Sequence, residues 1–116
     1  MYKPGLHLIA SLQCSNLNYL EKADYLKTVI DQQITFHQLQ NLGEVYHQFD
    51  PGGFTAIVCL SESHLSAHSW PEHQLLNIDI YLSNFQRVND GVVRSIFNSI
   101  VEKLEATILH QQEIVR

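Results

Sequence analysis

The segment from Gly52 to Glu72 constrains the fold most, because an apolar run is followed directly by a cluster of reactive side chains. Residues 54–61 are apolar on both faces in the middle of the run, which is typical of an interior strand of a sheet. Residues 65–70 continue in an extended pattern, and Pro71 ends the pairing because it has no amide donor. The preceding Asp50-Pro51-Gly52-Gly53 is a strong turn signal. We therefore predict two strands here, joined by a polar junction.

The rest of the chain supplies four more strands and two amphipathic helices. Strands are predicted over residues 5–12, 44–49, 75–82 and 108–115. One helix is predicted to be capped by Asn16 or Asn18 and to run to about residue 39. A second helix is predicted to begin at Asn89 or Asp90. Apolar positions in the helices recur every three or four residues: Leu20, Ala23, Leu26, Ile30 and Ile34 in the first, and Val93, Ile96, Phe97, Ile100 and Leu104 in the second.

Two helices can cover only one face of an antiparallel sheet, so the predicted fold class is α+β, a two-layer sandwich with both helices on one face. The other face of the sheet needs an apolar partner. A homodimer that packs sheet against sheet, in a four-layer αββα arrangement, is the simplest solution.

Length and composition exclude several classes of protein. The 116 residues make a single domain, and a net charge of −5 with only 7 lysines and arginines argues against nucleic-acid binding. No apolar run approaches the roughly 20 residues that span a bilayer, and no signal peptide is recognised, so we expect no membrane contact and a cytoplasmic location. Cys14 and Cys59 do not make a disulfide framework.

Ser63 is the residue at the polar junction with the most chemical potential. Its peptide bond follows a buried strand, where the backbone can be held under strain, and Glu62, His64 and His68 supply proton carriers close by. Thr55 adds a second hydroxyl on the preceding strand. Most serines in this position only bond to nearby backbone, so spacing alone leaves both roles open. The histidines do not indicate a metal site, because ligands four residues apart lie next to each other on a helix, and this segment is predicted to be a strand.

The chain resembles the short, prokaryotic, pyruvoyl-dependent S-adenosylmethionine decarboxylase family. The similarity lies in the opening GLHLIA (5–10), in HQFDPGG (47–53), in SESHLSAHSWPE (61–72) and in IDIY (78–81). It implies that the Glu62–Ser63 bond cleaves itself into a β chain of residues 1–62 and an α chain of residues 63–116. Ser63 would attack the carbonyl of Glu62 and become the pyruvoyl cofactor. Thr55, where the family has a serine, would assist, and His68 would remove the Cα proton.

The same resemblance implies a reaction and a substrate pocket. The reaction is decarboxylation of S-adenosylmethionine to the aminopropyl donor for spermidine, with the pyruvoyl ketone as electron sink. Phe49 would stack on the adenine ring, and Trp70 and Glu72 would line the pocket. The residues alone also allow a plainer interpretation, in which Phe49 and Trp70 belong to the core and Glu72 is a solvated turn residue.

The chain departs from the family after the strand that contains Asp79. The family has Phe-Thr-Cys-Gly there, and its cysteine donates a proton; this chain has Ser83 and Asn84 in place of the cysteine and the glycine. A serine is a far weaker acid than a cysteine, so His68, Tyr81 or a water would have to replace it. Asn84 is also expected to reshape the pocket. Asp79 itself is either catalytic or a buried structural acid.

Three hypotheses about function therefore remain open. The first is an S-adenosylmethionine decarboxylase. The second keeps the pyruvoyl chemistry but acts on another amino acid, such as ornithine or arginine. The third is an uncleaved, non-catalytic homologue that serves as a dimer partner or regulator.

Overall fold

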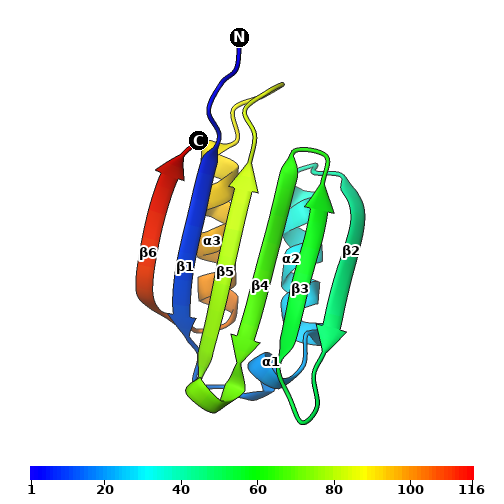
Figure 1. Ribbon diagram of the computed structural model, residues 1–116, viewed down its shortest axis with the longest axis vertical. Helices are drawn as coiled ribbons and strands as arrows, with labels where there is room; N and C mark the ends of the chain where they lie inside the picture. Colours follow the sequence, from blue (N-terminus) through cyan, green and yellow to red (C-terminus); the bar gives the residue numbers. More distant parts are fainter.

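The computed structural model describes residues 1–116 as one six-stranded antiparallel sheet with helices on one of its faces (Figure 1). The strands lie in the order β2-β3-β4-β5-β1-β6. Their bounds are β1 Leu6–Gln13, β2 Asn41–Gln48, β3 Phe54–Leu60, β4 Ser63–Trp70, β5 Leu75–Leu82 and β6 Thr107–Val115. The helices are α1 Asn18–Glu21, α2 Asp24–Phe36 and α3 Asp90–Lys103, with a 3₁₀ turn, η1, at Pro71–His73. The predicted α+β class and two-layer arrangement are confirmed.

The core lies between the sheet and α2 and α3. Alternate residues of the inner strands point into it, as the burial of Leu8, Val58, Leu65 and Ile80 shows. The predicted apolar stripes of both helices are buried against these residues, namely Leu20, Ala23, Leu26, Ile30 and Ile34, and Val93, Ile96, Phe97, Ile100 and Leu104. The period of 3.6 residues in the helices and of two in the strands therefore predicted the buried faces correctly.

The first helix is not continuous, and in this respect the prediction was wrong. The predicted cap is wrong as well: the N-cap of α1 is Leu17, which makes no side-chain capping hydrogen bond, and α1 ends at Glu21. Asn16 lies in the preceding turn, where its Oδ1 accepts a hydrogen bond from the Asn18 amide at 3.1 Å. Lys22 has an extended backbone (φ −127°, ψ 147°), and α2 then begins at Asp24. The break frees the Glu21 carbonyl, which accepts a hydrogen bond from Gly53 at 3.0 Å. A hydrogen bond from Gly53 thus replaces the bond that the Glu21 carbonyl would accept within a continuous helix.

Strand bounds differ from the prediction by up to three residues, the most at β2, which begins at Asn41 rather than at residue 44. β4 begins at Ser63 rather than at residue 65, and Ser63 pairs with Leu60 on β3 and with Leu82 on β5. β3 is an interior strand as predicted, although it lies second from the edge of the sheet. Its side chains Ile57 and Cys59 are exposed rather than buried, because no helix covers that face.

The uncovered face of the sheet, called the open face below, carries apolar and ionisable side chains together. Val45, Ile57, Trp70 and Ile114 are exposed on it. His64, Asp79 and His7 lie on the same face, on the central strands β4, β5 and β1. Figure 1 shows α2 and α3 behind the sheet and nothing in front of it. None of the helices combines the length and the apolar character that crossing a bilayer would require.

Candidate functional site

The β3–β4 hairpin carries predicted site residues at both of its ends. Thr55 and His68 face each other across the two strands, and the Thr55 Oγ1 lies 3.2 Å from the His68 Nδ1. Glu62 and Ser63 lie at the turn end of the same hairpin, where β4 begins. The antiparallel register places these two groups at opposite ends of the sheet.

Thr55 and His68 line a pocket of about 360 Å³ together with the three residues predicted to bind substrate, Phe49, Trp70 and Glu72. The rings of Phe49 and Trp70 are about half exposed, at 49% and 48%, so the interpretation of these rings as core is wrong. Asn77 fixes the indole by accepting a hydrogen bond from the Trp70 Nε1 at 2.8 Å. Glu72 is exposed on η1. Its exposure fits both a residue at the rim of this pocket and a solvated turn residue.

The backbone at Ser63 has an unusual conformation. Its φ is 131°, in a region that side-chain-bearing residues rarely adopt and that costs on the order of 1–3 kcal/mol. The carbonyl oxygen of Glu62, directly before it, accepts a hydrogen bond from the Ser83 amide at 2.8 Å. The carbonyl of the Glu62–Ser63 peptide is therefore held by a hydrogen bond, and the backbone of Ser63, the next residue, is strained.

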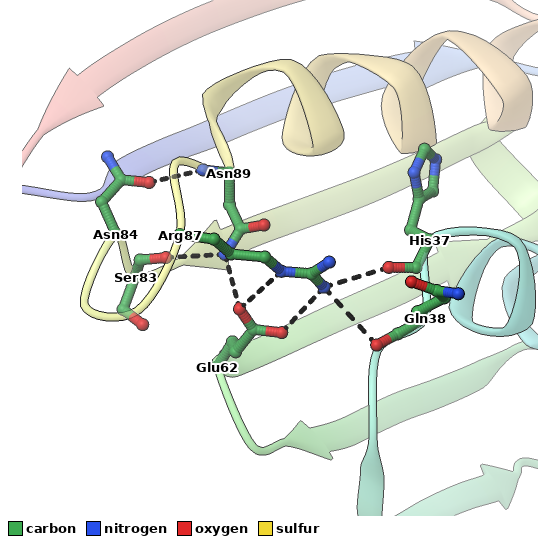
Figure 2. Close-up of polar contacts among 7 residues, drawn as sticks. All are labelled: His37, Gln38, Glu62, Ser83, Asn84, Arg87 and Asn89. Atoms are coloured by element: carbon green, nitrogen blue, oxygen red, sulfur yellow. Dashed lines mark hydrogen bonds and ion pairs between the residues drawn. The ribbon is translucent and has the colours of Figure 1, made fainter.

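The Glu62 side chain is fixed by two residues of the loop between β5 and α3, as Figure 2 shows. Arg87 donates from Nε to Oε1 at 3.1 Å and from Nη2 to Oε2 at 3.0 Å, and the Asn89 Nδ2 donates to Oε1 at 2.8 Å. The Arg87 guanidinium holds the pKa of the Glu62 carboxyl below its usual range, and Asn89 adds to that effect against the opposing effect of burial. No sequence pattern indicated a site role for Arg87, and Asn89 was indicated only as the start of a helix, because neither lies in the motifs shared with the family.

A cleft of about 710 Å³ opens beside this contact. Glu62 and Ser83 line it with Gln38, Gln40, Ser61, Phe85, Gln86 and Arg87. Asn84 is absent from the lining and is 7% exposed. Its side chain donates to the Pro4 carbonyl at 2.9 Å and accepts from the Asn89 amide at 2.7 Å. Asn84 thus shapes the cleft indirectly, by fixing the loop that carries Arg87 and Asn89.

Tyr81 and Asp79 belong to neither pocket. Both project from β5 onto the open face, where Tyr81 pairs with His64 and Asp79 with Ser66. A hydrogen bond with Tyr2 raises the pKa of Tyr81, and burial raises it further, so Tyr81 is a poorer acid than an ordinary tyrosine. Asp79 is only partly buried, so its interpretation as a buried structural acid is wrong.

One chain does not bring Ser63 and His68 together. They lie five residues apart on the straight strand β4, a distance of about 17 Å at 3.3 Å per residue. The eight predicted site residues thus form two groups: Glu62, Ser63 and Ser83 at one end of the sheet, and Phe49, Thr55, His68, Trp70 and Glu72 at the other. A direct contact between Ser63 and His68 of the same chain is excluded by this register.

Comparison with known proteins agrees with this fold and these motifs. Residues 6–116 match the family model described as S-adenosylmethionine decarboxylase. The S-adenosylmethionine decarboxylase proenzyme of Archaeoglobus fulgidus is 38% identical over 101 residues, which cover 87% of this chain and 87% of that protein. The proenzyme of Thermoplasma acidophilum is 32% identical, covering 97% of this chain and 82% of that protein.

The fold is also found among solved structures. The crystal structure of the adenosylmethionine decarboxylase from Aquifex aeolicus superposes with a TM-score of 0.81 at 24% identity, covering 100% of this chain and 91% of that one. With the family model matched over nearly the whole chain, this protein belongs to the S-adenosylmethionine decarboxylase family.

Proposed function

We propose that this protein is a pyruvoyl-dependent S-adenosylmethionine decarboxylase that makes its own cofactor by cleaving the Glu62–Ser63 bond. Family membership supports the activity. The observation that carries the cleavage is the peptide itself, with Ser63 at a φ of 131° and the Glu62 carbonyl bonded to the Ser83 amide at 2.8 Å.

Self-cleavage can be written with the chain's own atoms. The Ser63 Oγ forms a bond to the carbonyl carbon of Glu62, the C–N bond breaks, and the hydroxyl proton ends on the new amine. Removal of the Ser63 Cα proton then expels the Glu62 carboxylate and leaves an enamine. Hydrolysis consumes one water and releases one ammonia. Residues 1–62 end in a carboxylate, and residues 63–116 begin with a pyruvoyl group.

The residues present fit such a group and its substrate. A pyruvoyl ketone supplies an electron sink for the carbanion that loss of carbon dioxide would otherwise leave. The exposed rings of Phe49 and Trp70 offer flat faces to an adenine and to a sulfonium cation, and Glu72 offers a carboxylate to ribose hydroxyls. Ornithine and arginine carry no heterocyclic base, so the two exposed rings favour S-adenosylmethionine over these amino acids.

We further propose that the working enzyme is a homodimer with two sites, each built from both chains. A two-fold axis that crosses the open face near the middle of β4 would bring Ser63 of one chain toward His68 of the other, because the two residues lie at opposite ends of that strand. The exposed Val45, Ile57 and Ile114 give the open face apolar surface to bury in a four-layer αββα packing. In this dimer His68 removes the Cα proton of the partner chain's Ser63.

Both cysteines, Cys14 and Cys59, are free thiols, which suits a reducing compartment, and we propose a cytoplasmic enzyme.

Mass spectrometry of the purified protein tests the proposal. Two fragments, residues 1–62 and residues 63–116, are expected, with the second short of one ammonia and reactive toward a hydrazine. Ser63→Ala should give a single, folded, inactive chain. Decarboxylation is measured with S-adenosylmethionine, ornithine and arginine as substrates. A wild-type chain that stays whole after long incubation, with no reactive carbonyl, would support the non-catalytic homologue instead.

A further inference from the structure

We infer that Arg87 and Asn89 are positioning residues for self-cleavage: together they hold the Glu62 side chain so that the carbonyl beside Ser63 keeps a fixed orientation. The inference rests on the proposed function, since it concerns the same bond. These two residues lie in the loop between β5 and α3, outside the four motifs GLHLIA, HQFDPGG, SESHLSAHSWPE and IDIY.

Arg87 joins three separate segments of the chain. Besides its two bonds to the Glu62 carboxylate, its Nη2 donates to the carbonyl of His37 at 3.0 Å and to that of Gln38 at 3.5 Å, just beyond the end of α2 (Figure 2). The Glu62 side chain is 18% exposed and that of Arg87 39% exposed. A two-pronged guanidinium–carboxylate contact defines the direction of the carboxylate as well as its distance, which a single point charge does not.

Asn89 fixes the same carboxylate from within the protein. Its side chain is fully buried, and its Nδ2 donates to both the Glu62 Oε1 and the Ser83 carbonyl, each at 2.8 Å. Ser83 in turn donates its amide to the Glu62 carbonyl. Glu62 is therefore held through its side chain and its main chain by one continuous loop, residues 83–89.

This arrangement acts on the bond that would break. Attack by the Ser63 Oγ places negative charge on the Glu62 carbonyl oxygen, and a prealigned amide such as that of Ser83 stabilises such charge best when the carbonyl cannot rotate away. Rotation of the carbonyl requires Glu62 to move, and the contacts from Arg87 and Asn89 oppose that movement. Glu62 would also become the end of one fragment, while Arg87 and Asn89 belong to the other.

The test compares cleavage rates in Arg87→Ala, Asn89→Ala and Arg87→Lys with the wild type, by following the two fragments over time. Arg94→Ala is the matched control, because Arg94 makes the same two-pronged contact with Glu113, at 2.8 and 2.9 Å, away from Glu62. Hydroxylamine in a parallel sample cuts any ester that has formed and so reports the acyl shift separately from elimination. Each change is also made on the uncleavable Ser63→Ala chain, whose thermal unfolding reports stability alone.

We expect Arg87→Ala and Asn89→Ala to slow cleavage by about tenfold or more, with the hydroxylamine-released fragment falling in parallel, and Arg94→Ala to cleave as the wild type does. Arg87→Lys should lie between. Wild-type cleavage rates in Arg87→Ala and Asn89→Ala would overturn the positioning role while leaving the proposed function intact. If alanine at position 87 unfolds the uncleavable chain, Arg87→Lys decides, and its cleaving at the wild-type rate overturns the inference. A wild-type chain that never cleaves overturns both proposals.

Discussion

Ser83 is the residue at which this chain departs most from its family in chemistry. It lines the cleft beside Glu62, so its side chain lies near the bond proposed to break, and its amide already contacts the Glu62 carbonyl. A cysteine, with a pKa of about 8.5, gives up a proton near neutral pH far more readily than a serine hydroxyl. Tyr81 is a poor substitute for such an acid, because a hydrogen bond with Tyr2 and burial raise its pKa.

Ser83→Cys is therefore expected to raise the turnover number for S-adenosylmethionine by about tenfold or more, since a positioned acid contributes on the order of 10²–10⁴. The rate of self-cleavage should change little, because the amide at position 83 donates to Glu62 whatever the side chain. Release of carbon dioxide from fully cleaved protein measures the first quantity, and the time course of fragments the second. No gain in turnover would mean that proton donation does not limit the enzyme.

Among the elements, the start of β1 and the end of β5 are packed closely against each other. A Cβ added to Gly5 would lie 2.4 Å from the Leu82 carbonyl oxygen and 3.2 Å from the Ser83 Cα. Gly5 also exchanges two backbone hydrogen bonds with Arg116, both at 3.0 Å, which fixes it against the end of β6. The position of Ser83 after β5 thus depends on the absence of a side chain at Gly5, which precedes β1.

Gly5→Ala is expected to destabilise the protein by about 1–3 kcal/mol, the usual cost of forcing extra atoms into a packed site, and to slow self-cleavage by displacing Ser83. Gly91→Ala is the matched control. Gly91 lies in α3 with nothing within 4 Å of its added Cβ, so alanine there should stabilise the helix by about 0.5–1 kcal/mol. Urea unfolding of both variants on the Ser63→Ala chain measures these changes. Equal stability of the two variants would contradict this account of the β1–β5 contact.

At the scale of the whole molecule, Ser63 and His68 of one chain lie far apart along the same strand. About 17 Å of β4 lies between them, and no loop can close that distance, because both are held in the same antiparallel sheet. An activity that needs both residues must therefore draw them from two chains.

Mixing two inactive variants tests this prediction. Ser63→Ala lacks the residue that cleaves, and His68→Ala lacks the proposed base, but a mixed dimer contains one site with Ser63 from the second chain and His68 from the first. Co-expression should therefore restore cleavage of the His68→Ala chain and part of the decarboxylation, while each variant alone stays inactive. Decarboxylation and fragment analysis of the mixed dimer, isolated by two different tags, provide the measurement. Failure of the mixture to cleave would exclude a site shared in this way.

Much of the fold follows from local pattern. The stripes of α2 and α3 and the alternation in β1 and β5 are periodicities of adjacent residues, so the sequence alone predicted which side chains are buried. The break at Lys22 was not predictable in this way, because the carbonyl it frees is satisfied by Gly53, more than a helix length away along the chain. The exposure of Ile57 and Cys59 on β3 was not predicted for a similar reason. An apolar residue on a strand does not by itself show whether another element covers it.

The sequence by itself determined the chemistry available to this protein: a serine after an apolar strand, a threonine and histidines in neighbouring strands, and aromatic residues next to a turn. Only the tertiary structure decided which of these groups meet. It separated Ser63 from His68 along a rigid strand, and it brought Arg87 and Asn89 onto Glu62 across 25 and 27 residues of sequence. Residue type and spacing are properties of the chain, whereas contacts between distant segments depend on how sheet and helices pack.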